Sequence, residues 1–216
     1  MEESTTKEKI LKKIRDAIIY KIDNPFPKAD YEKSIYNEPD ENPDIAFATA
    51  FTKAGGKFVY CPDEKSAMIN IKTLVNEKKL TNIFTFDPEI QSFLTIANID
   101  FIKDARYLQS VNVGITYCEF LISRFGSIVI SSLMKSGRRL PVFSDIHIVL
   151  AFSSQIVPGI KEALAGIKNR YGQNIPSMIS IITGPSCTSE IENTFVTGVH
   201  GPREQYVFLI DDIKTI

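Results

Sequence analysis

Two glycine–proline turns near the end of the chain carry the residue types best suited to chemistry. Gly184-Pro185 follows an apolar run, and His200-Gly201-Pro202-Arg203 precedes another. An imidazole and a guanidinium held on a tight turn suit proton transfer or anion binding. In the alternative, His200 caps a neighbouring element and Arg203 pairs with Glu204 or another acid. The two turns are therefore either the two sides of one anion site or ordinary connections between elements.

The residues after the first turn predict a helix N-terminus. Ser186 and Thr188 lie at the start of a short helix expected from about Thr188 to Phe195, after a β-branched strand. Free backbone N–H groups there attract phosphate or carboxylate, and the hydroxyl groups add donors. The pattern matches neither a Walker A motif nor GxGxxG, so helix capping alone is an equally simple explanation. The ligand-binding candidates at the two turns are Gly184, Pro185, Ser186, Thr188, Gly201 and Arg203.

Further basic and acidic candidates lie in the middle of the chain. Arg138 and Arg139, with Lys135, lie on a glycine loop that either meets a phosphate or carboxylate or is simply solvated. Glu119 falls inside a predicted strand, where a carboxylate lies either at an exposed edge or at a functional position. His147 lies alone in the apolar run IHIVLAF, which is more typical of a satisfied core histidine than of a ligand.

The histidine and cysteine patterns indicate no metal site. The chain has two histidines, without HxH or HExxH spacing. The three cysteines, Cys61, Cys118 and Cys187, are far apart and form no CxxC pair. This spacing argues against a disulfide framework, a structural zinc or an iron–sulfur cluster. We predict neither a metal nor a cofactor bound by this chain itself.

The charge balance narrows the class of protein. The 216 residues carry 25 basic and 26 acidic side chains, a formal net charge of −1. This balance gives no global attraction to nucleic acid or to an anionic membrane. The N-terminus lacks an apolar signal segment, and no apolar run approaches membrane-spanning length. We therefore expect a cytoplasmic protein without nucleic-acid or membrane partners.

Hydrophobic periodicity separates an N-terminal arm, residues 1–43, from an α/β domain, residues 44–216. A helix is predicted over 4–23, and the proline-rich stretch 24–43 is either a surface arm or a lid or subunit-wrapping segment. Strands and helices then alternate, which favours a mostly parallel sheet. Helices are predicted over 44–54, 63–77, from 88 onward and over 154–168, and strands over 57–61, 81–86, 99–102, 146–152, 178–183 and 205–210.

The middle of the domain breaks this alternation. Residues 117–123 and 127–132 predict an antiparallel pair of strands, joined by a turn at Arg124-Phe125-Gly126. The predicted fold class is therefore α/β, a Rossmann-like and mostly parallel sheet with inserted antiparallel strands.

The second half of the chain resembles a known family. The resemblance runs from about Asn112 to Asp211 and rests on GITYCEF, GSIVISS, GRRLP, DIHIVLAFSSQIVP, ITGPSCTSEIE and GVHGPRE, in this order. These segments are similar to the lactate-utilisation protein C family, the LUD domain. The resemblance implies a fold similar to the sugar-phosphate isomerase and coenzyme A transferase superfamily. It also implies a role near the oxidation of L-lactate to pyruvate, beside an FAD- or iron–sulfur-containing partner chain from the same operon.

The chain departs from the family pattern at two stretches. Family members usually carry Gly-Ala-Asp and then Glu-Thr-Gly-Thr or Glu-Thr-Gly-Ser, where this sequence has Tyr117-Cys118-Glu119 and Arg124-Phe125-Gly126-Ser127. Related transferases use a glutamate as covalent nucleophile, so an arginine at position 124 argues against transferase chemistry. Gly126 and Ser127 of the second stretch join the ligand-binding candidates.

Three functions follow from these residues and from the resemblance. In the first, the chain is a subunit or accessory protein of an organic-acid utilisation system. Arg203, with Arg138 and Arg139, then holds a small anion, and His200 or Glu119 transfers a proton. In the second, the chain is an independent enzyme on a phosphorylated or coenzyme A-linked substrate. In the third, it is a non-catalytic interaction or regulatory module; enzymatic activity and a homodimeric assembly stay open.

Overall fold

The computed structural model describes residues 5–19, 26–28, 30, 41–188, 196–198 and 200–213. The chain separates into two compact units, Met1–Asn37 and Glu38–Ile216, and the second is called the main unit below. The first unit contains α1 (Thr6–Ile19), which begins with a capping box formed by Thr5 and Glu8. There the Glu8 carboxylate accepts from the backbone N–H of Thr5 at 2.8 Å. Most of the proline-rich stretch 24–43, the hypothetical lid, lies outside the described residues.

A parallel sheet of five strands forms the centre of the main unit, in the order β1-β11-β6-β3-β2. The strands are β1 (Lys57–Cys61), β2 (Ile83–Phe84), β3 (Val113–Thr116), β6 (Ile146–Phe152) and β11 (Glu204–Ile210). Each pairs in parallel with its neighbours. All five strands therefore end at one edge of the sheet, the carboxyl edge, and begin at the opposite one, the amino edge.

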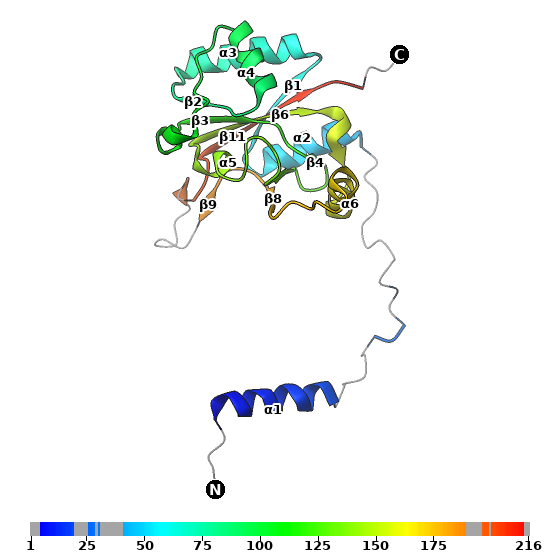
Figure 1. Cartoon of the computed structure of the whole chain (residues 1–216). Coiled ribbons are helices and arrows are strands. Elements are labelled where there is room, and N and C mark those ends of the chain that lie inside the picture. Colours follow the sequence, from blue (N-terminus) through cyan, green and yellow to red (C-terminus); the bar gives the residue numbers. More distant parts are fainter. Residues whose placement is uncertain are drawn as a thin grey trace. The chain divides into compact units, whose positions relative to one another are not determined.

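Two helices cover one face of this sheet, α3 (Glu64–Lys78) and α4 (Pro88–Ile96), as Figure 1 shows. Helix α3 begins where the Asp63 carboxylate accepts from the backbone N–H of Ser66 at 2.7 Å. Apolar residues spaced one turn apart, such as Ala67 and Ile71, face inward and are fully buried. They pack with alternate residues of the strands, which face these helices, in the largest hydrophobic cluster of the main unit.

The other face carries helix α2 (Pro43–Lys53) and a second sheet in the order β7-β4-β5-β8. Its strands are β4 (Phe120–Ile122), β5 (Ser127–Ser131), β7 (Ile156–Val157) and β8 (Ile179–Ile182), and α6 (Ile160–Tyr171) packs on it. Strands β4 and β5 are antiparallel, which confirms the predicted pair. The stacked rings of Phe47 and Phe51 fill the space between α2 and the parallel sheet.

Shorter elements complete the described part of the chain. These are η1 (Ala105–Ser110), α5 (Leu140–Phe143), η2 (Ser153–Gln155) and the antiparallel pair β9 (Cys187–Thr188) and β10 (Val196–Thr197). Among the described residues, no helix is both long and apolar enough to cross a membrane. The expected fold class, a mostly parallel α/β sheet with inserted antiparallel strands, is confirmed.

Three predicted elements differ from the structure. The segment 99–102 is not a strand, because only Ile102 forms an isolated bridge, to Phe84. The helix expected over 154–168 begins at Ile160, after β7 has paired with β4. Residues 187–188 form strand β9 rather than the start of a helix, and the rest of that predicted helix lies outside the described residues.

Candidate functional site

The two glycine–proline turns contact each other through the backbone. The N–H of Ser186 donates to the carbonyl oxygen of Pro202 at 2.8 Å, and the N–H of Gly198 donates to the carbonyl oxygen of Ser186 at 2.9 Å. A methyl group at Gly201 would lie 3.1 Å from Cβ of Ser186. Residues 184–186 and 200–203, called the turn pair below, therefore form one continuous surface.

The two turns meet because the strands beside them belong to different sheets. Strand β11 is parallel to both neighbours, whereas β8 belongs to the second sheet and runs antiparallel to β5. Strand β8 delivers its following turn to the amino edge, beside Ala54 and Gly55, just before β1 begins.

Two of the predicted ligand-binding glycines make close packing contacts. Gly126 and Gly184 have φ of +60° and +72°, a region that favours glycine. A methyl group at Gly126 would lie 2.1 Å from the backbone nitrogen of Phe51, and one at Gly184 would lie 2.2 Å from the carbonyl oxygen of Ala54. Both glycines therefore seat their loops directly on the end of α2.

Ser127 and Pro185 belong to the same packed region. The buried Ser127 hydroxyl lies 2.7 Å from the Thr183 hydroxyl, which joins β5 to the end of β8. The Pro185 ring packs at the position that a side chain on Gly55 would reach. These residues hold the turn pair in place, and the side chain of Thr188 lies outside what the structure describes.

Arg203 presents an exposed guanidinium from a fixed backbone. Its N–H donates to the carbonyl oxygen of Asp145 at 2.7 Å. Its aliphatic stem crosses Gly198, where a methyl group would come within 2.1 Å of Cγ of Arg203. Among the described residues, no acidic side chain forms an ion pair with this guanidinium. A fixed cation of this kind suits a carboxylate or a phosphate.

The neighbouring Glu204 does not neutralise Arg203. Its carboxylate pairs with Lys57 and Lys78 and accepts from the hydroxyl of Tyr206 at 2.7 Å. Burial by itself raises the pKa of Glu204, but the hydrogen bonds from these three partners lower it to about 2. The alternative in which Arg203 pairs with Glu204 is therefore not the arrangement in the structure.

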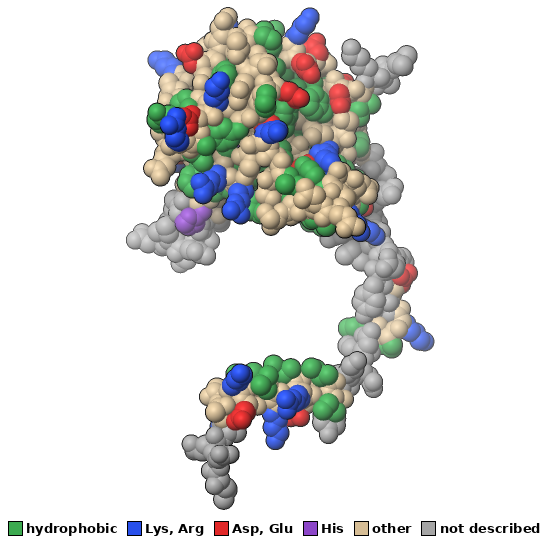
Figure 2. All heavy atoms as spheres, viewed as in Figure 1, with side chains coloured by type: hydrophobic (Ala, Val, Ile, Leu, Met, Phe, Trp, Pro, Cys, Tyr) green, Lys and Arg blue, Asp and Glu red, His purple; other side chains and the backbone are tan. Residues whose placement is uncertain are grey.

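The other basic candidates lie on the same side of the main unit. His200 is exposed, and so are Arg138 and Arg139, which precede the one-turn helix α5. That helix leads to Asp145, the residue whose carbonyl oxygen receives the Arg203 N–H. Figure 2 shows Lys and Arg side chains close to a histidine side chain at the lower left of the main unit.

The structure separates Glu119 from the turn pair. Glu119 follows β3 at the carboxyl edge, whereas Arg203 precedes β11 at the amino edge. The Glu119 side chain is 1% exposed and accepts from the hydroxyls of Ser131 and Tyr171, both at 2.6 Å, and from Arg170. Of the two alternative proton-transfer candidates, only His200 therefore lies on the turn pair, because Glu119 lies at the opposite edge of the parallel sheet.

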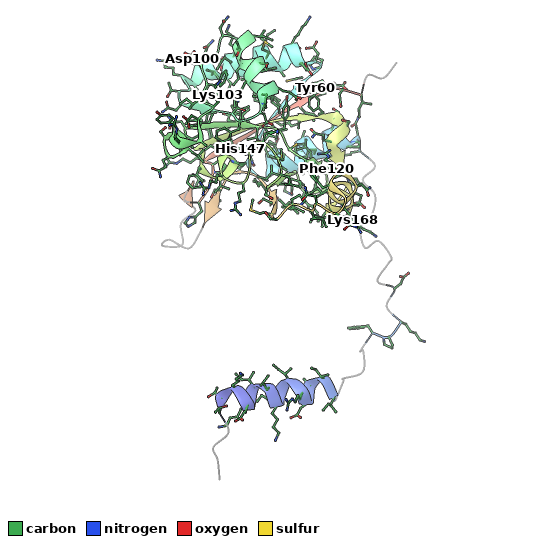
Figure 3. All side chains as sticks on the ribbon, in the orientation of Figure 1. Tyr60, Asp100, Lys103, Phe120, His147 and Lys168 are labelled. Carbon is green, nitrogen blue, oxygen red and sulfur yellow. The ribbon has the colours of Figure 1, made fainter. Side chains whose placement is uncertain are left out.

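The contacts of Glu119 fasten α6 to the second sheet. The guanidinium of Arg170, on α6, lies over the ring of Phe120 with its carbon 5.1 Å from the ring centroid. Figure 3 shows Phe120 beside α6, and a methyl group at Gly166 would lie 2.3 Å from this ring. A carboxylate held by three donors is already satisfied, which fits an anchor better than a proton-transfer group.

His147 is a core histidine. It lies inside the main unit in Figure 3, with Nε2 3.0 Å from the Thr116 hydroxyl and Nδ1 3.3 Å from the side-chain nitrogen of Gln205. The Thr116 hydroxyl donates to the carbonyl oxygen of Tyr117, so it accepts from Nε2–H, and Nδ1 accepts from Gln205. Burial lowers the pKa of His147 to about 4, so the ring is neutral. Among the described residues, no group of three metal-ligating side chains exists.

Sequence reasoning missed a cavity of about 440 Å³ at the carboxyl edge. Its walls include Tyr117, directly after β3, and the last residues of two strands, Phe152 of β6 and Ile210 of β11. The available signal was the rule that ligands gather outside the carboxyl ends of parallel strands. The sequence alone did not show which side chains line this edge.

Comparison with known proteins gives one family match. The sequence model of the LUD domain matches residues 96–210, more than half of the chain. This range contains both turns of the turn pair, the Arg138-Arg139 loop and Glu119.

Several curated relatives are called lactate utilization protein C. Lactate utilization protein C 1 of Bacillus mycoides is 29% identical over 150 residues, which cover 68% of this chain and 64% of the relative. The protein of Geobacillus sp. strain WCH70 is 35% identical over 112 residues, 51% of this chain and 46% of the relative. The Bacillus subtilis protein is 35% identical over 112 residues, which cover 51% of this chain and 47% of the relative. Each match spans less than two thirds of the relative.

A solved structure has a similar fold. It is the crystal structure of a DUF162 family protein from Deinococcus radiodurans, with a TM-score of 0.55 and 19% sequence identity. The superposition covers 78% of this chain and 96% of that protein. At this identity the likeness concerns the fold alone.

Proposed function

Because this chain belongs to the LUD domain family, we propose that it takes part in organic-acid utilisation, in the step from L-lactate to pyruvate. The chain acts there as a subunit or accessory protein, and the turn pair binds a small anionic ligand. The relatives named lactate utilization protein C support this role. Because the matches leave more than a third of each relative uncovered, the role rests on the shared domain.

One observation carries the ligand assignment, the guanidinium of Arg203 held on the turn pair. Its backbone is fixed by Asp145 and its stem by Gly198, so little side-chain entropy is lost when a ligand binds. A planar guanidinium offers two parallel N–H groups to a carboxylate. The ligand class that fits is a small carboxylate such as lactate or pyruvate.

His200 supplies a proton-transfer group next to this cation. It lies on the same turn as Arg203 and is exposed to solvent. Oxidation of a 2-hydroxy acid removes two electrons and two protons, and an imidazole is suited to accept the hydroxyl proton. The two electrons would pass to an FAD or iron–sulfur centre on a partner chain, and the second proton would pass to the flavin or to solvent. The cysteine spacing of this sequence fits no iron–sulfur cluster of its own.

The experiment is calorimetric titration of the purified full chain with L-lactate, pyruvate, a sugar phosphate and a coenzyme A thioester. Arg203→Gln removes the guanidinium, and Lys168→Gln, on the exposed face of α6, removes one positive charge elsewhere. We expect saturable binding of a carboxylate that weakens at least about tenfold in Arg203→Gln only. Unchanged affinity in Arg203→Gln would sink the assignment.

The ligand panel also separates the alternatives. Binding of the sugar phosphate or the thioester, without the carboxylates, would favour an enzyme on a phosphorylated or coenzyme A-linked molecule. Lactate-dependent reduction of an electron-accepting dye by the isolated chain would contradict the need for a redox partner. If none of the four ligands binds, the result would favour a non-catalytic interaction module over the anion-binding role.

A further inference from the structure

The cavity at the carboxyl edge is built like a small-molecule site. Its volume of about 440 Å³ falls within the range of ligand pockets. It lies where three neighbouring parallel strands end, between the first half of α3 and one face of α4, the position at which open α/β sheets gather ligands. The turn pair lies at the opposite edge, so the cavity is independent of the anion site.

Aromatic and apolar side chains form most of its wall. The rings of Tyr117 and Phe152 are stacked, with centroids 6.1 Å apart and planes 23° from parallel. Both line the cavity and both are only partly buried, so each ring keeps accessible surface. Phe93 and Met68 line it from the two helices. A flat ring entering this space gains stacking and apolar contact together.

The polar lining of the cavity includes two carboxylates, Glu64 and Glu89, with Lys65 as the only cation among the lining residues. Ser92 and Tyr117 add hydroxyl groups. Burial and the carboxylates of Glu89, Asp87 and Glu64 raise the pKa of Tyr117 to about 12, so its phenol keeps its proton. Carboxylates accept hydrogen bonds and repel anions. A ligand with N–H donors and without a carboxylate therefore fits this lining best.

We propose that the carboxyl-edge cavity binds a planar nitrogen heterocycle, of the nucleobase or nicotinamide class. The ring stacks on Tyr117 and Phe152, and its N–H groups donate to Glu89 or Glu64. The neutral amide or amine distinguishes this ligand from the carboxylates that suit the turn pair.

The test is calorimetric titration of the full chain with adenosine and with the matched pair nicotinamide and nicotinate. The last two differ only in an amide against a carboxylate, so we expect nicotinamide to bind more tightly. Tyr117→Leu removes the stacking ring and is expected to weaken adenosine at least about fivefold, whereas Tyr117→Phe keeps the ring and the affinity. Glu89→Gln is expected to reduce the preference for nicotinamide over nicotinate. Glu162→Gln on α6 is the charge control.

Two outcomes overturn the proposal. One is the absence of saturable binding of both adenosine and nicotinamide at millimolar concentration. The other is binding that Tyr117→Leu and Glu89→Gln leave unchanged while the melting temperatures confirm folded variants. Arg203→Gln is expected to leave heterocycle binding intact, so failure here is distinguishable from failure of the anion site.

Discussion

The backbone N–H of Ser186 lies 2.8 Å from the carbonyl oxygen of Pro202 and donates to it, which joins two layers of the main unit. Ser186 follows β8 of the second sheet, and Pro202 precedes β11 of the parallel sheet. Each turn is therefore anchored in a different sheet, and their contact depends on how the two sheets pack. Changes that disturb this packing are expected to affect anion binding at the turn pair.

Gly198→Ala tests the seat of the Arg203 side chain. The new methyl group would come within 2.1 Å of Cγ of Arg203, so the stem must move and the guanidinium with it. We expect carboxylate affinity to fall at least about fivefold, by analogy with a misplaced charged hydrogen bond. Titration calorimetry measures the effect.

Gly172→Ala is the matched control for Gly198→Ala. Gly172 also has a positive φ, +57°, but a methyl group there meets no atom within 4 Å. It shares the backbone strain of about 1 kcal/mol without touching the site. Equal loss of affinity in both variants would show that strain, rather than the displaced arginine, is responsible.

Gly184→Ala and Gly126→Ala test whether these glycines serve packing. Both methyl groups would lie about 2 Å from backbone atoms of the end of α2, which no rotamer change can relieve. We expect the free energy of unfolding in urea to fall by about 3 kcal/mol or more in each variant. A cost no larger than that of Gly172→Ala would contradict the close contact with α2.

A double-mutant cycle on Glu119 and Arg170 is expected to give unequal effects for the two single variants. Arg170→Met leaves the buried Glu119 carboxylate without its cation, so we expect the free energy of unfolding to fall by about 2 kcal/mol or more. Glu119→Gln removes the buried charge, and the double variant is expected to be more stable than Arg170→Met alone. Carboxylate affinity at the turn pair should not change in Glu119→Gln. A large loss of affinity there would restore a direct role for Glu119 in the anion site.

His147 predicts a specific loss of stability in acid. Burial lowers its pKa to about 4 in the folded chain, from 6.5 in the unfolded chain. Between these values the unfolded chain binds the extra proton, so this stability is complete above pH 6.5 and is lost as the pH falls toward 4. Between pH 7 and pH 5 we expect the free energy of unfolding to decrease by about 2 kcal/mol more in the parent than in His147→Gln. Parallel pH profiles of the two proteins would show that His147 titrates normally.

The local elements of the main unit followed closely from the sequence. The run IHIVLAF forms β6, and the helices predicted over 44–54 and 63–77 form α2 and α3, because caps and side-chain periodicity act over a few residues. The antiparallel pair β4–β5 also followed, since its turn and both strands are contiguous. Short strands were harder to predict, because the segment predicted as a strand over 99–102 forms only an isolated bridge at Ile102.

The candidate site was only partly predictable. The sequence singled out Arg203 and His200 because a cation and an imidazole on a glycine turn are unusual together. It did not show that Gly126 and Gly184 face the backbone of α2, or that Glu119 lies at the other edge of the sheet. These facts depend on pairings between residues far apart in the chain.

By itself, then, the sequence determined the alternation of strands and helices, the two turns and the charged residues that they carry. Tertiary structure alone decided which sheet each strand joins and therefore which turns meet. Strand β8 pairs with β5 instead of extending the parallel sheet, and this pairing brings Ser186 to Pro202. Apolar strands of similar composition fit either sheet locally, and only the packing of two layers around α2 selects between them.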